Sequence, residues 1–184
     1  KAYHTGAIAV DQASGSRYHS HSIALGGLFG RKDIGVRLAA EQAQCNLNGL
    51  YVTTGREHID FHTCVDHLVA RGTSREFFKG VLSGASRAVF NGKVIVHPDA
   101  QQTDAQQSNK NLLLSEDAEI DTKPQLEIFA DDVKCSHGAT IGQLDESQVF
   151  YLRARGLSEQ AARNVLTYAF CEEIIALLPV EALR

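Results

Sequence analysis

Alternating apolar and polar residues dominate the first three quarters of the chain. Ten short stretches carry this pattern, and Gly, Ser, Asn and Asp, residues typical of turns, separate them. Because successive side chains of a strand point to opposite faces, such stretches predict strands with one buried face. The expected strands are Tyr3–Val10, Tyr18–Leu25, Ile34–Ala39, Asn46–Val52, Ile59–Val65, Glu76–Leu82, Ala88–Val96, Asn111–Leu114, Leu126–Ile128 and Val133–Ile141.

Three features of this region favour a solenoid, although strand spacing alone permits a sandwich or a barrel as well. Gly49, Gly80 and Gly92 each lie inside an apolar stretch, and we expect them at equivalent bends of successive coils. The segment DAQQ at 99–102 recurs at 104–107, which would supply amides that stack between coils. Two-residue hairpin sequences are scarce. Gly80 and Gly92 should therefore stack about 4.8 Å apart in a parallel ladder.

The period of the pattern changes after the last predicted strand, from two residues to about 3.6. Asp145 is expected to cap a first helix, with Gln148 as its capping-box partner, and Gly156 to end it. Ser158 should cap a second helix with an apolar stripe, which either packs against the β region or forms a docking surface. The stripe consists of Ala162, Val165, Leu166, Ala169, Phe170, Ile174, Leu177 and Leu178.

Composition limits the possible classes of protein. Hydrophobic residues form 43% and charged residues 22% of the 184 residues, and the formal net charge is −4. These values argue against disorder, and no apolar run approaches the roughly 18 residues of a membrane span. A mildly acidic chain without a Lys/Arg cluster is poorly suited to nucleic acid. Four dispersed cysteines and the lack of a signal peptide predict a soluble cytoplasmic protein with reduced thiols.

The chain has the features of a fragment. It contains no methionine, even at position 1. Its last six residues, from Pro179 onward, read like the first turn of a helix that stops without a cap. We therefore expect part of the protein's machinery to lie outside this sequence.

Cys135 and His137 are the leading candidates for ligands. One residue separates them in a predicted strand, so their side chains should share a face. A thiolate and an imidazole on one rigid face form a half-site for zinc, iron or an iron–sulfur cluster. Spacing alone equally permits a structural role, because cysteine is often buried and a lone C-x-H motif is an incomplete metal site.

Four motifs surround these two residues in a fixed order. They are NLLLS at 111–115, IDTKPQLEI at 120–128, VKCSHGAT at 133–140 and FYLRARG at 150–156. Together they resemble the C-terminal signature of the SufB/SufD family of iron–sulfur cluster assembly proteins. The CSHGAT wording is similar to the SufD branch, because the SufB branch has an acidic residue at the position of Gly138.

This resemblance implies a fold and a function. The fold would be mainly β, a right-handed parallel β-helix over 1–143 followed by a small, truncated α-helical subdomain over 144–184. The function would be that of a non-catalytic scaffold that pairs with SufB and binds the ATPase SufC through its C-terminal helices, with a SufD homodimer as a further possibility. The cofactor would be a transient iron–sulfur cluster shared with SufB, with none permanently bound.

The same resemblance implies site residues. His137 would be a ligand or proton-handling group at the boundary between the two scaffold subunits, with Cys135 second. Tyr151, Arg153 and Arg155 would contact the ATPase subunit. The interior sulfur-accepting cysteine of the family belongs to the SufB pattern, and no motif assigns that role to a cysteine of this chain.

Other polar residues support a second hypothesis, a β-solenoid or cupin-like metalloenzyme acting on a sugar or a small acid. His19 and His21 share a strand face, but the Glu of a cupin site does not follow them. His58 and His62 also alternate along a strand, without a recognisable motif. The adjacent pair 131–132 (DD) is expected in a turn or bulge, because neighbouring strand residues point to opposite faces. The sequence has no Walker A loop, G-x-G-x-x-G or G-x-S-x-G motif.

Overall fold

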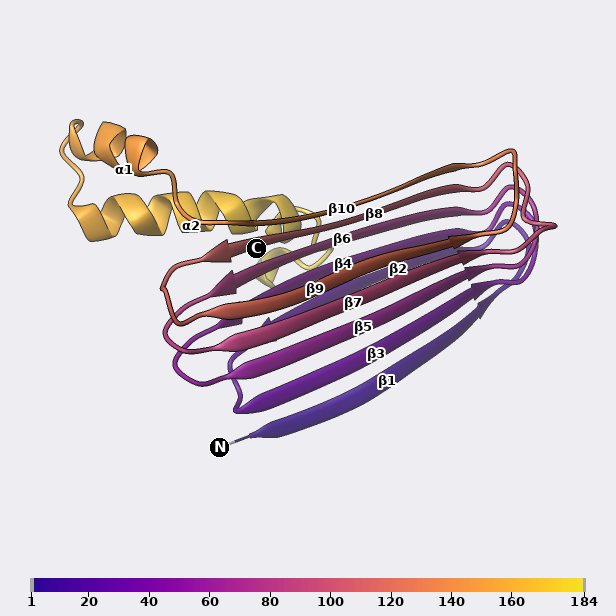
Figure 1. The fold of residues 1–184 in the computed structure, drawn as a ribbon, viewed down its shortest axis with the longest axis horizontal. Coiled ribbons are helices and arrows are strands. Elements are labelled where there is room, and N and C mark those ends of the chain that lie inside the picture. Colours follow the sequence, from indigo (N-terminus) through magenta and orange to yellow (C-terminus); the bar gives the residue numbers. More distant parts are fainter. Residues whose placement is uncertain (1, 184) are drawn as a thin grey trace.

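The structure is a computed structural model that describes residues 2–183, with ten strands, two α-helices and one short 3₁₀ helix (Figure 1). The strands are β1 (Tyr3–Gln12), β2 (Arg17–Leu25), β3 (Phe29–Leu38), β4 (Gln44–Thr53), β5 (His58–His67), β6 (Thr73–Leu82), β7 (Arg87–Val96), β8 (Asp104–Leu113), β9 (Glu119–Ile128) and β10 (Lys134–Gly142). The helices are α1 (Glu146–Arg153), α2 (Glu159–Ile175) and the 3₁₀ helix η1 (Glu181–Leu183). Within the described range, each helix is too short or too polar to cross a membrane.

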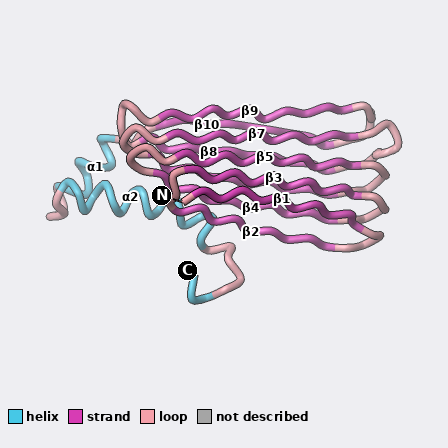
Figure 2. The backbone as a smooth tube through the Cα atoms, turned by 90° about the horizontal axis from the view of Figure 1, so that it is seen from below, coloured by secondary structure: helices cyan, strands magenta, loops and turns pink. Residues whose placement is uncertain are grey.

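Each strand from β1 to β8 pairs in parallel with the strand two places further along the chain. The odd-numbered strands form one sheet in the order β1-β3-β5-β7-β9, and the even-numbered strands form a second in the order β10-β8-β6-β4-β2. One odd and one even strand therefore make a coil, and the coils stack in a right-handed sense (Figures 1 and 2). The prediction of a parallel β-solenoid followed by helices is confirmed.

All ten predicted strands overlap observed strands, but β8 and β9 are much longer than predicted. β8 begins at Asp104 and β9 at Glu119, whereas the predicted strands began at residues 111 and 126. Their first halves are polar, so the apolar alternation that marks the other strands is missing there. The parallel ladder with β6 and β7 compensates by supplying backbone partners from Asp104 and Glu119 onward.

The expected stacking of Gly80 on Gly92 is wrong. Gly80 lies in β6 and Gly92 in β7, which belong to opposite sheets. These glycines lie inside strands, where they leave room for large side chains. A Cβ on Gly80 would overlap the ring of Tyr51, and a Cβ on Gly49 would overlap the ring of Phe78. Their apolar surroundings therefore reflect aromatic packing and not a bend.

The equivalent bends lie in the turns between strands. The turns after β1, β3, β5 and β7 each contain one left-handed residue; these are Gly15 (φ 65°), Gln42 (φ 61°), Arg71 (φ 63°) and Gln102 (φ 59°). Backbone bonds join the turns of successive coils, since Gln102 N donates to Asp132 O at 2.6 Å. Three of these four positions are not glycine, whereas the turns after β2, β4 and β6 do carry left-handed glycines, namely Gly26, Gly27, Gly55 and Gly84. The repeated DAQQ segment falls once in such a turn and once in β8, so its copies are not equivalent.

A row of aromatic rings fills the space between the two sheets. Tyr51, Phe61, Phe78 and Phe90 come from β4, β5, β6 and β7 in turn, and the centroids of successive rings are 5.8, 5.5 and 4.9 Å apart. None of the four is more than 2% exposed. Tilted ring pairs of this kind add about 0.5–1.5 kcal/mol each beyond the burial of apolar surface. The row therefore joins the two sheets across three consecutive coils.

Polar side chains share the same interior. The hydroxyl of Tyr51 donates to Asn111 Oδ1 at 2.5 Å and accepts from Asn109 Nδ2 at 3.1 Å. Thr122, from the opposite sheet, donates to Asn109 Oδ1 at 2.8 Å. These bonds satisfy amides and hydroxyls that would otherwise be costly to bury.

Glu76 and Gln107 form a second interior polar group. Each side chain is only 2% exposed, and Gln107 Nε2 donates to Glu76 Oε1 at 3.0 Å. Burial raises the pKa of Glu76 to about 7, and the hydrogen bond from Gln107 partly opposes that shift. The carboxyl is therefore largely protonated in the folded protein below neutral pH.

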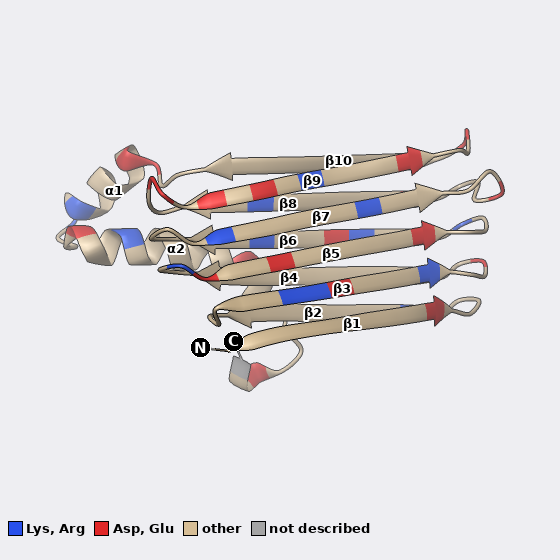
Figure 3. Ribbon diagram, turned by 60° about the horizontal axis from the view of Figure 1, so that its bottom comes forward, with Lys and Arg blue, Asp and Glu red and all other residues tan. Residues whose placement is uncertain are grey.

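The outer face of the odd-numbered sheet carries charges of both signs, which pair between neighbouring coils (Figure 3). Arg87 in β7 contacts Asp121 in β9 at 2.8 Å, and Lys93 in β7 contacts Glu127 in β9 at 2.8 Å. Both pairs are substantially exposed, so they contribute little to stability one by one. Mixed charges do, however, keep this broad flat sheet from presenting a single-sign field.

Both helices begin at the predicted caps. Asp145 Oδ1 accepts from Ser147 N at 2.8 Å, and Ser158 Oγ accepts from Ala161 N at 3.2 Å. Gly156, with φ at 96°, adopts the left-handed conformation expected of a terminator after α1. The capping bond at Asp145 comes from Ser147 N, whereas the capping-box pattern predicts that Gln148 closes the box.

The second half of α2 packs on the outer face of the even-numbered sheet (Figure 1). Cys171 and Ile174 are buried there against Leu50, Val81 and Leu112. Only part of the predicted apolar stripe is used in this way, because Val165 is 48% exposed and Leu177 is 47% exposed. The first half of α2 and all of α1 extend past the ends of the strands (Figure 1).

Lys79, in β6, fixes α2 to the sheet. Its side chain is 1% exposed, and its Nζ donates to Phe170 O at 2.6 Å and contacts Glu173 Oε2 at 3.0 Å. The Nζ also lies 4.2 Å from the centroid of the Phe170 ring. The hydrogen bond from Lys79, with the attraction of its charge, lowers the pKa of Glu173.

We predict that Lys79→Met lowers the free energy of unfolding by about 1–3 kcal/mol, because it removes a charge-assisted hydrogen bond from a buried contact. Lys110→Met is the matched control: Lys110 is 43% exposed and lies 3.8 Å from the same Glu173. We expect that variant to change stability by less than about 0.5 kcal/mol. Urea unfolding measures both, and equal losses would contradict the anchoring role of Lys79.

A second prediction concerns Glu76. Since its pKa is about 7 when folded and close to 4.5 in a solvated chain, the folded state holds the extra proton, and stability falls as pH rises from 4.5 to 7. Glu76→Gln removes that penalty while keeping an acceptor for Gln107. The variant should therefore gain more stability relative to the parent at pH 8 than at pH 5, as measured by urea unfolding. A difference between the two proteins that is the same at both pH values would refute this.

Candidate functional site

The last coil of the described solenoid has two open edges. Among the described strands, β9 pairs with β7 alone and β10 with β8 alone. Each therefore leaves one row of backbone N–H and C=O groups unpaired along its outer side. β10 also exposes apolar surface, since Ile141 is 51% exposed.

Cys135 and His137 lie on this terminal strand. In the register they pair with Ala105 and Gln107 of β8, whose side chains are buried between the sheets, so both point to the inner side of the sheet. Cys135 is half-buried and packs against the edge of the core, whereas His137 is exposed. Burial raises the pKa of the Cys135 thiol, an effect that a backbone hydrogen bond at Ala105 opposes.

The chain supplies these two ligands without a third. No group of three or more His, Cys, Asp or Glu side chains in the described range is arranged to hold a metal ion. A stable site for zinc or iron takes four ligands, or three and a water molecule. Any metal or cluster held at Cys135 and His137 therefore needs ligands from outside the described residues.

The other histidine pairs have different surroundings. His19 and His21 lie on the outer face of β2, where His19 Nδ1 contacts Asn46 Nδ2 at 3.3 Å, and burial, followed by the charge of His19, lowers the pKa of His21. His62 Nε2 contacts Asp60 Oδ1 at 2.8 Å. Neither pair is joined by the further ligands that the metalloenzyme hypothesis requires among residues 2–183.

The DD pair at 131–132 lies in the bend between β9 and β10, where a turn was expected. Asp132 N donates to Gln101 Oε1 at 2.9 Å, so this bend is tied to the turn of the previous coil. This bond, together with the one from Gln102 N to Asp132 O, connects the turns of successive coils.

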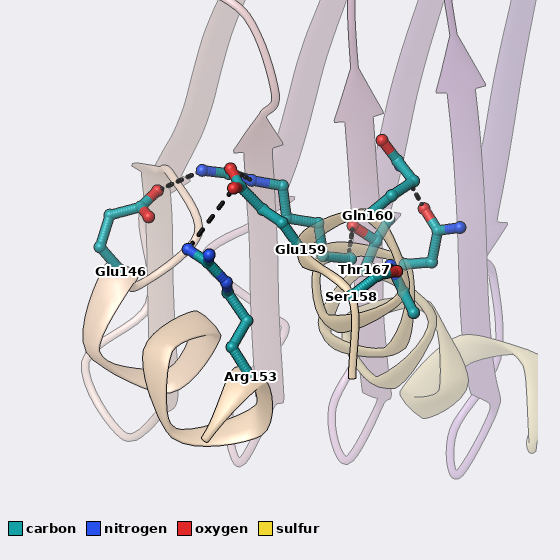
Figure 4. Close-up of polar contacts among 9 residues, drawn as sticks. Glu146, Arg153, Ser158, Glu159, Gln160 and Thr167 are labelled. Carbon is teal, nitrogen blue, oxygen red and sulfur yellow. Dashed lines mark hydrogen bonds and ion pairs between the residues drawn. The ribbon is translucent and has the colours of Figure 1, made fainter. Parts of the chain in front are cut away.

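Tyr151, Arg153 and Arg155 lie on α1 and the turn that follows it. Arg155 stacks over the Tyr151 ring at 4.3 Å from its centroid and donates to the Tyr151 hydroxyl. Arg153 instead points to Glu159 at the start of α2, 3.5 Å away (Figure 4). The structure therefore brings Tyr151 and Arg155 together, while Arg153 helps hold the two helices in place.

A groove between the helices accompanies these residues. It measures about 450 Å³, and its lining residues are Ser147, Gln148, Tyr151, Leu152, Val165 and Leu166. Phe150, 72% exposed, and Tyr168, 56% exposed, lie on the same two helices. The sequence pattern predicted an apolar side for α1 that includes Phe150 but did not mark Tyr168, although an aromatic residue outside the main stripe of a helix is a signal for a second contact face.

Comparison with known proteins supports an assignment. Residues 1–170 match the family described as "SUF system FeS cluster assembly, SufBD core domain". The chain is 44% identical to the iron–sulfur cluster assembly protein SufD of Escherichia coli over 165 residues, 90% of this chain and 39% of that protein.

A SufBD family protein of Synechocystis is 40% identical over 182 residues, which cover 99% of this chain and 40% of that protein. SufD of Bacillus subtilis is 30% identical over 133 residues, 72% of this chain and 30% of that protein. The chain thus spans about two fifths of the length of the first two relatives. The match over the whole solenoid, together with these identities, shows that the chain belongs to the SufBD family of iron–sulfur cluster assembly proteins.

Proposed function

We propose that this chain is part of a non-catalytic, cytoplasmic scaffold subunit that pairs with SufB at its last coil and binds the ATPase SufC through α1 and α2. The scaffold holds a nascent iron–sulfur cluster transiently, in a site shared with SufB. The observation that carries this proposal is the position of His137 and Cys135 on β10, an edge strand with one unpaired side.

An open edge strand favours a partner. Unpaired backbone groups of β9 and β10 can be satisfied by strands of another subunit, and backbone hydrogen bonds then supply much of the affinity. Exposed Ile141 would be covered in the same contact. SufB is the partner we propose, and a second copy of this chain is the competing occupant that size measurements would reveal.

The chemistry of the two side chains suits a shared, transient site. A neutral imidazole is a weaker cluster ligand than a thiolate, so a cluster held through His137 can be passed on. Cys135 contributes less, because its raised pKa favours the protonated thiol. The missing thiolates would come from SufB, since two ligands do not make a complete site.

The helical pair suits a docking role. The groove between α1 and α2 is bordered by the exposed side chains of Tyr151 and Val165. The ion pair between Arg163 and Glu146, 2.7 Å long, joins the two helices and keeps the groove in shape. The helices that form this apolar groove extend beyond the β-solenoid, so the groove is accessible to a globular partner such as SufC.

We predict that His137→Ala in the full-length protein leaves the complex with SufB and SufC assembled but blocks cluster formation. Cys135→Ser should have a milder effect, because its half-buried thiol also packs against the core. Complementation of a strain that lacks its own copy, under iron limitation, measures cluster supply, and gel filtration measures assembly. Full rescue by His137→Ala would return both residues to a structural role.

We also predict that Val165→Asp in the full-length protein weakens SufC binding by about tenfold or more, because a charge replaces an apolar contact in the groove. Val180→Asp is the control: Val180 is 50% exposed, much like Val165, but does not line the groove. Both variants should keep the parent circular dichroism spectrum. Equal SufC affinity of the two variants in titration calorimetry would exclude the groove as the docking surface.

A further inference from the structure

Three polar residues stack on successive rungs of the even-numbered sheet. Glu76 in β6 pairs in register with Gln107 in β8, which pairs in register with His137 in β10. All three occupy inward positions. The column therefore runs from a fully buried carboxyl group to an exposed imidazole at the open end.

The amide of Gln107 is held from below. Its Nε2 donates to Glu76 Oε1 at 3.0 Å, which fixes which end of the amide faces Glu76. Its Oε1 is buried and has no hydrogen-bond partner among the described residues. Buried acceptors are almost always hydrogen-bonded, so this unpaired oxygen is available to a donor group nearby.

Gln107 is distinct in this respect from the other inward amides of β8. Asn109 Oδ1 accepts from Asn111 Nδ2 at 2.6 Å and from Thr122 Oγ1 at 2.8 Å. Asn111 Oδ1 accepts from the hydroxyl of Tyr51 at 2.5 Å. The free acceptor thus lies on the rung directly beneath His137.

The His137 ring lacks a hydrogen-bond acceptor, which Gln107 can supply. No hydrogen bond or ion pair joins its ring to another residue in the described part of the chain. Its Cα is nevertheless in register with that of Gln107 on the neighbouring strand, so the two side chains stack on the inner side of the sheet. An imidazole ligand normally donates its second ring N–H to an oxygen acceptor, which sets the tautomer and the direction of the ligating nitrogen.

We propose that Gln107, oriented by Glu76, is a positioning residue for His137: its free Oε1 accepts a ring N–H, and the other ring nitrogen faces outward. This proposal rests on the proposed function of His137 and adds the residue that orients its imidazole ring. Gln107 itself does not contact the iron–sulfur cluster. Above neutral pH the Glu76 carboxylate can only accept, so Nε2 stays on Glu76 and Oε1 remains the end of the amide that is free for the ring.

The test is the tautomer ratio of the neutral His137 imidazole in the full-length protein, labelled with ¹⁵N-histidine. Its signals are identified by their loss in His137→Asn. Gln107→Met keeps the volume of the side chain but removes the acceptor. We expect it to move the ratio about threefold or more toward that of a free imidazole, which is the effect of losing one neutral hydrogen bond.

Asn109→Ala is the matched control, because it removes another buried amide of β8 that lies beneath Ala139 and not beneath His137. It should leave the tautomer ratio at the parent value even if it lowers stability. Gln107→Glu, which keeps an acceptor oxygen, should also retain the parent ratio, and it decides the question if Gln107→Met does not fold.

Three results would overturn the proposal: a parent ratio equal to that of free imidazole, an unchanged ratio in Gln107→Met, or a free-imidazole ratio in Gln107→Glu. The proposed function fails separately. Full rescue of cluster supply by His137→Ala would remove the cluster role and leave the tautomer ratio unaffected, so the two outcomes cannot be confused.

Discussion

The parallel backbone ladder between coils is the interaction on which the rest of the structure depends. Because residues pair in register one coil apart, as Phe61 does with Phe90, each inward side chain must fit the one above it. Large rings are accommodated where the neighbouring rung is glycine, as Gly49 is for Phe78. The same rule places Gln107 on top of Glu76, and so brings a polar column into an apolar interior.

The sequence predicted the strands wherever one face is apolar, and failed where the ladder alone holds them. β8 and β9 begin with polar residues, so their first halves carried no alternation to detect. The bends after β3 and β5 were also missed, because Gln42 and Arg71 adopt the left-handed conformation there in place of glycine. Here stacked backbone bonds between coils outweigh the intrinsic preference of the residue.

The candidate site was partly readable as well. Spacing placed Cys135 and His137 on one strand face, and the surrounding motifs indicated their chemistry. The role of Gln107 could not be read, because it depends on a register between strands about thirty residues apart. The same holds for Lys79. A lysine inside an apolar run is unusual, but its partner Phe170 lies 91 residues further along the chain, so the sequence did not show which group it contacts.

At the end of the solenoid formed by β9 and β10, the chain direction of the edge strands limits how a partner can pair with them. Every described strand pair is parallel. A partner end related to this one by a twofold axis would meet β9 or β10 with a strand that runs the opposite way. The junction would then be antiparallel, with its alternating wide and narrow pairs, inside an otherwise parallel assembly. If the axis passes between two copies of β10, residues near the middle of that strand, such as His137, would lie closest to it and so to their counterparts across it.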